Sequence, residues 1–199
     1  GKATMGSGPV AGRGPDLTYG RRRVPSIHLD SQGMVEILTD PETSLLQRDY
    51  FLLRLEEEFK KSWRYGWGYA LIVFDVEELS DVKAQDGERA WSAVALAIAG
   101  EILSASRDID LSTRFEDGRF MVLLPGCDGD GARAFVDRVL RGQVRERLDD
   151  RFHVTVGGTI TPQPGLDQME ELMGRAEEAL VRARESGGDE LVLWSDSTG

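Results

Sequence analysis

The sequence predicts an α/β domain in which helices pack on a central mixed sheet of about five strands. Strand-length apolar runs alternate with amphipathic segments in the order α β α β β α β α β, an order typical of helices covering a mixed sheet. Residues 69–76 are nearly all apolar, as in a strand at the centre of a sheet. Asp117-Gly118 lies between two further strand candidates, and this pair favours a hairpin because both residues tolerate positive φ.

The other elements follow from the same periodicities. A first helix is expected over 34–62, where Leu52, Leu55 and Phe59 recur at helical spacing after a cap region at Asp40. Three more helices are expected at 89–106, 130–148 and 167–186. Besides 69–76, strands are expected at 111–115, 119–124, 152–160 and 190–194.

Composition divides the chain of 199 residues into two parts. Residues 1–33 are rich in glycine and proline and have a net charge of +3, which predicts a flexible basic arm. The net charge of the whole chain is −11, so residues 34–199, the expected folded domain, have a net charge of −14. So acidic a domain argues against nucleic-acid and membrane binding. The single cysteine, Cys127, excludes an internal disulfide and suits the cytoplasm.

A basic and an acidic residue directly precede the expected hairpin as Arg107-x-x-Asp110. Such a pair suits recognition of a guanine edge. Arginine can donate two hydrogen bonds to O6 and N7, and a carboxylate can accept from the base N–H groups. The alternative is a surface ion pair worth about 0–1 kcal/mol.

These residues resemble the GGDEF (diguanylate cyclase) family, in which an Arg-x-x-Asp inhibitory site precedes the Gly-Gly-Asp/Glu-Glu-Phe turn by five residues. Residues 111–115 supply that spacing here. The family's N-terminal motif, Asp-x-Leu-Thr-Gly-Leu-x-Asn-Arg-x-x-Phe, is matched at Asp40, Thr43, Leu45, Arg48 and Phe51. The resemblance covers roughly 40–194 and implies a bacterial protein with the palm-like fold of nucleotidyl cyclases.

The resemblance also implies a degenerate active site. Asp75 matches the family's first metal ligand, but other functional positions differ. Lys83 and Ser92 replace base-contacting residues, Glu116 and Asp117 replace two glycines, Gly118 replaces the catalytic acid, and Arg119 replaces the second metal ligand. We therefore expect no metal, no cofactor and no enzymatic activity, and an ion pair between Asp75 and Arg119.

The expected function is that of a catalytically inactive receptor for cyclic di-GMP as a regulatory ligand. The resemblance implies binding through Arg107 and Asp110, joined by Arg138 and, as a further candidate, Arg133 from the 130–148 helix. For Arg138, an ordinary solvated helix residue is the competing interpretation. The receptor would signal to an unidentified protein partner. The basic arm is one candidate for contacting this partner, and a dimer whose formation depends on the ligand is a further candidate. The alternative is a protein-interaction scaffold that binds no nucleotide.

Overall fold

The computed structural model describes residues 18–19, 22–23, 33, 37–142, 146 and 152–197. Its strands are β1 (Thr18–Tyr19), β2 (Arg22–Arg23), β3 (Tyr69–Val76), β4 (Leu111–Glu116), β5 (Arg119–Pro125), β6 (Val154–Thr161) and β7 (Leu191–Leu193). Its longer helices are α2 (Arg48–Tyr65), α3 (Leu79–Asp86), α4 (Glu88–Ala105), α5 (Gly129–Arg141) and α7 (Met169–Glu185), and a 3-10 helix follows at Trp194–Ser197. Most of the expected basic arm lies outside the described residues, so its flexibility stays a prediction.

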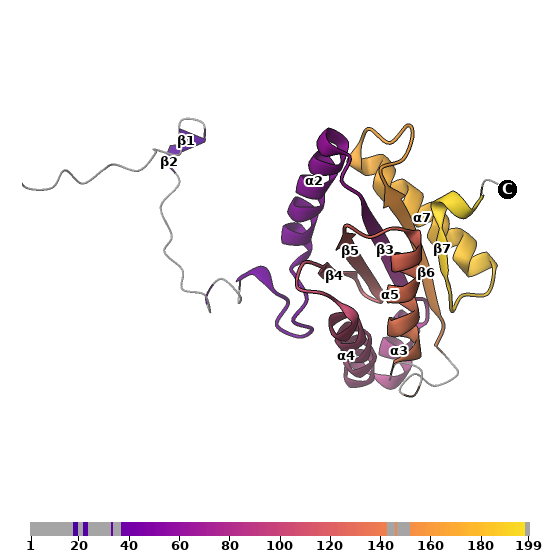
Figure 1. Ribbon diagram of the computed structural model, residues 1–199. Helices are drawn as coiled ribbons and strands as arrows, with labels where there is room; N and C mark the ends of the chain where they lie inside the picture. The colour runs from indigo at the N-terminus through magenta and orange to yellow at the C-terminus, as the bar shows by residue number, and fades with distance from the viewer. Residues whose placement is uncertain are drawn as a thin grey trace, which may run out of the picture.

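A five-stranded mixed sheet in the order β4-β5-β3-β6-β7 forms the centre of the domain. β3 pairs antiparallel with β5 and β6, and β7 runs parallel to β6. Figure 1 shows this sheet between its helices. The architecture confirms the predicted fold class, and all eight residues of β3 are buried, as its apolar sequence indicates.

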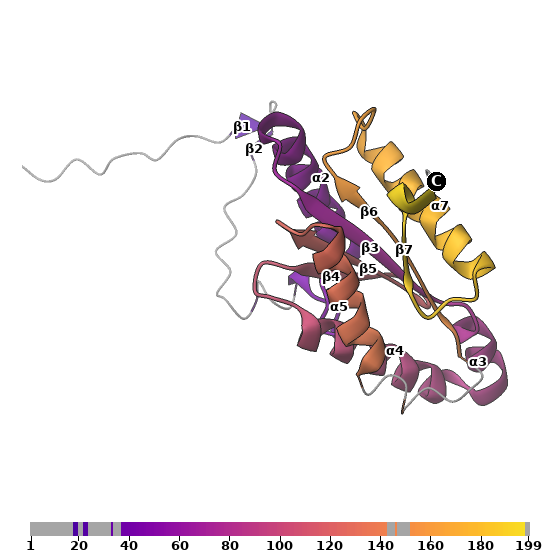
Figure 2. The ribbon, with the colours of Figure 1, turned by 45° about the vertical axis from the view of Figure 1, so that its right-hand side comes forward.

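Two apolar clusters cover the two faces of the sheet. Ala70, Ile72 and Phe74 of β3 face a core completed by α3, α4 and α5. Leu71 and Val73 point to the other face, where α2 and α7 pack. Figure 2 shows α5 and α7 on opposite sides of the strands. Among the described residues, no helix is long and apolar enough to cross a membrane.

The hairpin forms where the sequence predicts it. β4 and β5 meet at Asp117-Gly118, with Gly118 at φ 80° and an irregular register between Arg114 and Glu116. A Cβ at Gly118 would lie 2.8 Å from the carbonyl oxygen of Val76, so the turn sits against the end of β3. Glycine is therefore required both for the backbone angle and for the close approach.

The helix expected in the 34–62 segment is interrupted, because residues 37–38 are helical but residues 39–47 are not. Residues 39–47 form a turn with isolated bridges instead, and α2 starts at Arg48. Within this turn the Thr43 hydroxyl donates to Asp40 Oδ2 at 2.7 Å. These polar side chains therefore stabilise a turn and do not cap a helix. The short helix α3 was not expected. It ends at Gly87 (φ 87°), which separates it from α4.

Candidate functional site

Charged side chains gather at both ends of β5. Arg119 begins this strand beside Asp75 of β3, and Pro125 ends it beside Tyr69. The first end holds an ion-pair network, and the second borders a pocket at the Arg107–Asp110 turn.

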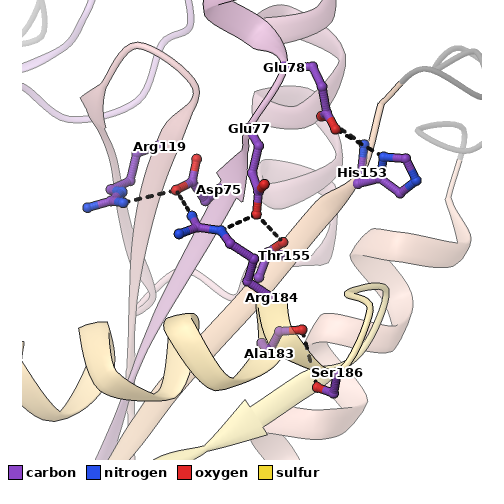
Figure 3. A network of polar contacts seen from close by, with 9 residues as sticks. All are labelled: Asp75, Glu77, Glu78, Arg119, His153, Thr155, Ala183, Arg184 and Ser186. Atoms are coloured by element: carbon purple, nitrogen blue, oxygen red, sulfur yellow. Dashed lines mark hydrogen bonds and ion pairs between the residues drawn. The ribbon is translucent and has the colours of Figure 1, made fainter.

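At the first end, Asp75 accepts hydrogen bonds from two arginines (Figure 3). Its Oδ2 lies 2.9 Å from Nη2 of Arg119, which confirms the expected ion pair, and 3.3 Å from Nη2 of Arg184. Nη1 of Arg119 also lies 2.9 Å from Oε1 of Glu177 on α7. Burial lowers the pKa of Arg119, but the hydrogen bond to Asp75 and the charge of Glu177 outweigh it, so the net shift is upward. The network therefore ties α7 to the sheet through ion pairs.

Glu77, which was not expected from the sequence, also belongs to this network. Its Oε1 accepts from the Thr155 hydroxyl at 3.1 Å and pairs with Nε of Arg184. Beside it, Glu78 contacts His153 Nδ1 at 3.0 Å (Figure 3). A signal was present in the sequence, because Glu77 follows Asp75 by two residues, the spacing that places side chains on one side of an extended chain.

Two carboxylates of the network that could ligate a divalent metal ion are paired with arginines instead. Asp75 and Glu77 are each engaged by a guanidinium group. Within the described parts of the chain, no group of three or more His, Cys, Asp or Glu side chains is placed to hold a metal. The expectation that no metal is bound stays a prediction.

The other positions that the resemblance marked as active-site departures lie around this end of the sheet. Lys83 Nζ lies 4.6 Å from the centre of the Trp91 ring, and Arg114 Cζ lies 4.1 Å from it. Ser92 follows Trp91 on α4 and is half-buried. Glu116 and Asp117 are exposed on the hairpin. A buried indole with two cations on it thus occupies the space between α3, α4 and the hairpin.

We expect the Asp75–Arg119 pair to contribute measurably to stability. In a double-mutant cycle of Asp75→Asn and Arg119→Ala, the coupling energy from urea unfolding should be about 1 kcal/mol, within the range for contacting residues. The exposed Arg141–Asp137 pair, at 3.4 Å on α5, is a matched control, for which the coupling should be near zero. Equal coupling in the two cycles would show that burial adds nothing to the Asp75 pair.

At the second end, the Arg107–Asp110 turn is held by its own side chains. Asp110 Oδ2 accepts from the Arg107 backbone N–H at 2.7 Å, and its Oδ1 accepts from Arg107 Nη2 at 2.9 Å. The same Nη2 donates to the carbonyl of Pro125 at 2.9 Å. The hydrogen bond to Asp110 raises the pKa of Arg107. The Asp110 side chain is only 1% exposed, whereas that of Arg107 is 53% exposed, so Asp110 positions an arginine that faces solvent.

A pocket of about 280 Å³ opens beside this turn. Arg107, Asp110 and Arg138 all line it, together with Phe135 and Cys127. Arg138 reaches it from α5, where its Nη2 makes a long 3.4 Å contact to the carbonyl of Ala105. Burial raises the pKa of Cys127, so its thiol is neutral at pH 7. The structure thus brings together three of the four residues expected to bind ligand.

Arg133 does not join them. Its Nη2 lies 2.7 and 2.8 Å from the two carboxylate oxygens of Asp196, and its Nη1 donates to the carbonyl of Leu191. Five residues on an α-helix turn the side chain by about 140° from Arg138, which directs Arg133 to the C-terminal segment instead.

Comparisons with known proteins agree on one family. The family model described as "Diguanylate cyclase, GGDEF domain" matches residues 37–190. The diguanylate cyclase DgcP of Pseudomonas aeruginosa is 32% identical over 170 residues, covering 83% of this chain and 25% of DgcP. The probable diguanylate cyclase DgcT of Escherichia coli is 24% identical, covering 77% of this chain and 35% of DgcT. The chain thus spans about a quarter to a third of these curated relatives.

Solved structures are similar as well. The diguanylate cyclase SiaD of Pseudomonas aeruginosa, in complex with its activator SiaC, has a TM-score of 0.70 at 29% identity, covering 80% of this chain and 63% of SiaD. The GGDEF domain of DgcB from Caulobacter crescentus, in complex with c-di-GMP, has a TM-score of 0.71 at 19% identity, covering 85% of this chain and 99% of that one.

The expectation that the chain is not an enzyme is wrong in view of these relatives, because DgcP and DgcM of Escherichia coli are named diguanylate cyclases, which are enzymes. That expectation rested on individual motif positions. The structure retains two carboxylates, Asp75 and Glu77, with the cation of Arg184 beside them. Counting departures from a motif therefore underestimates the charged groups that this end of the sheet retains.

Proposed function

Because the chain belongs to the GGDEF family, we propose that it binds cyclic di-GMP in the pocket between the Arg107–Asp110 turn and α5. The observation that carries this proposal is the convergence of Arg107 and Arg138, from different elements, on one pocket of about 280 Å³. The DgcB structure in complex with c-di-GMP supports the choice of ligand, since it shows that a GGDEF domain of this fold takes that nucleotide.

The charges of the pocket suit a dianionic ligand with guanine bases. Arg107 is held at one edge by Asp110 and Pro125, yet half of its side chain stays exposed. It can therefore donate to guanine O6 and N7 or to a phosphate without giving up its support. The long Arg138 contact leaves that side chain able to turn towards a second phosphate. In a domain this acidic, capture of an anion depends on such local arginines.

For Asp110 we propose a different role from the one that the family resemblance implies. Its carboxylate already accepts three hydrogen bonds from Arg107 and is almost wholly buried. We assign it the orientation of Arg107 rather than direct contact with guanine nitrogens.

Signalling to a protein partner is the further part of this proposal. SiaD, in complex with its activator SiaC, supports it as an example of a related protein with a protein partner. The alternative is a scaffold that binds partners without nucleotide.

Calorimetric titration with cyclic di-GMP tests whether the ligand binds in this pocket. The test compares substitutions of two arginines on α5, one that lines the pocket and one that does not. Arg138→Ala should weaken binding about tenfold, equivalent to about 1.4 kcal/mol. Arg133→Ala is the matched control, because its side chain pairs with Asp196 and lies outside the pocket. Equal affinity of wild type and Arg138→Ala would refute the location. No binding to the wild type would favour the scaffold.

Diguanylate cyclase activity is the second candidate function. The observation that favours it is the 32% identity to DgcP over most of this chain. Incubation with GTP and Mg²⁺, followed by chromatographic detection of cyclic di-GMP, tests it directly. Asp75→Asn serves as the control, because Asp75 is the acidic residue at the centre of the network at the end of β3. Product from the wild type but not from this variant would support the candidate, and no product from either would remove it.

A further inference from the structure

The outer face of α2 carries large apolar side chains that no other described element covers. Leu53 is 53% exposed and Trp63 is 73% exposed. They lie ten residues apart on α2. This helix runs along one edge of the domain (Figures 1 and 2). A tryptophan exposed to this extent is uncommon on a soluble domain and is typical of an interaction surface.

Charged residues on this face follow a mirrored pattern. Leu53, Glu56, Lys60 and Trp63 are spaced by three, four and three residues, which places them on one stripe of the helix. Along the stripe the order is apolar, acidic, basic, apolar. Read in the opposite direction, the order is apolar, basic, acidic, apolar, so the stripe is complementary in charge to a reversed copy of itself.

We propose that α2 docks antiparallel against α2 of a second copy of this chain. A two-fold axis that crosses the stripe midway between Leu53 and Trp63 would place Leu53 opposite the partner's Trp63 and Glu56 opposite the partner's Lys60. A contact that uses the same patch on both subunits is the commonest arrangement of a two-fold dimer. The Glu56–Lys60 pair within the helix, at 2.7 Å and largely exposed, lies in this stripe and would extend into a four-charge cluster across the axis.

A hollow at the C-terminal end of α2 provides room for the partner's apolar side chain. It has a volume of about 410 Å³ and is lined by Lys60, Trp63 and Arg64. The antiparallel register brings the partner's Leu53 to this position, where it would cover the indole of Trp63. An acidic peptide would pair with Lys60 and Arg64 but would leave Leu53 and Glu56 without complement, so a second copy is the better match.

The contact is limited to one helix of 18 residues, about 27 Å long. Interfaces of this extent lie at the small end of the range for specific complexes, so a weak dimer that depends on concentration is expected.

Charge reversal tests the register. In sedimentation velocity of the full chain without nucleotide, the wild type should shift from monomer to dimer as its concentration rises. Glu56→Lys alone and Lys60→Glu alone should each reduce dimerisation at least tenfold, because like charges then face one another twice. An equimolar mixture of the two variants should restore the dimer, because every Lys then faces a Glu across the axis.

Two further variants distinguish the α2–α2 contact from nonspecific association. Trp63→Ala should weaken the dimer, whereas Val181→Ala, at 48% exposed on α7, should leave it unchanged. Circular dichroism confirms that each variant is folded. A wild type that remains monomeric at every concentration, or a mixture that fails to recover the dimer, would overturn the proposal. Both readouts are independent of cyclic di-GMP binding.

Discussion

Arg107→Ala is expected to reduce the affinity for cyclic di-GMP by about 100-fold or more in calorimetric titration. The substitution removes the guanidinium that Asp110 and the Pro125 carbonyl hold at the pocket edge. It also leaves the nearly buried Asp110 carboxylate facing an anionic ligand with only backbone support. Losing two charge-assisted hydrogen bonds and adding repulsion costs about 3 kcal/mol together, which is equivalent to this factor.

Conservative variants separate charge from geometry at the same position. Arg107→Lys keeps the positive charge but cannot bridge Asp110 and a guanine edge with one planar group, so about tenfold weaker binding is expected. Arg141→Ala, an exposed arginine at the end of α5, is the control and should bind as the wild type does. Wild-type affinity in Arg107→Ala would place the ligand elsewhere on the domain.

Much of the fold follows from local sequence. The apolar run of β3 and the Asp117-Gly118 turn define the centre of the sheet and its hairpin, and both are confirmed. The predicted start of the first helix was wrong. The hydrogen bond from Thr43 to Asp40 stabilises a turn there, which helical periodicity does not reveal. α3 escaped prediction because an eight-residue helix offers little periodicity, although Leu79 and Val82 are buried.

The sites are less predictable because their contacts join distant segments. Arg107 and Asp110 are three residues apart, so their pairing follows from the motif itself. The Glu177 contact to Arg119 spans 58 positions, and no local pattern indicates it. Arg133 was predicted to line the pocket from its distance along the helix alone. The rotation of the helix between Arg133 and Arg138 was not considered. Activity was misjudged for a related reason, since substitutions at single positions do not show which charged neighbours gather around them.

Gly157→Ala is expected to lower the free energy of unfolding by about 3 kcal/mol, the upper part of the range for overpacking. Gly157 lies in β6 beneath α7, and a Cβ there would stand 2.3 Å from the Leu180 amide nitrogen and 2.5 Å from its Cα. Both atoms belong to the helix backbone, so no side-chain rotation can relieve the clash. Relief requires α7 to move away from the sheet, which exposes the apolar cluster of Leu172, Ala176 and Leu180.

Gly174→Ala, on α7 itself, is the matched control in urea unfolding. A Cβ at Gly174 has no atom within 4 Å, so the same substitution should stabilise the helix by about 0.5–1 kcal/mol. Opposite signs for the two glycines would confirm how closely α7 approaches β6, and equal effects would contradict it. Because α7 also carries Glu177 and Arg184, its displacement should weaken the charge network around Asp75 and any activity that depends on it.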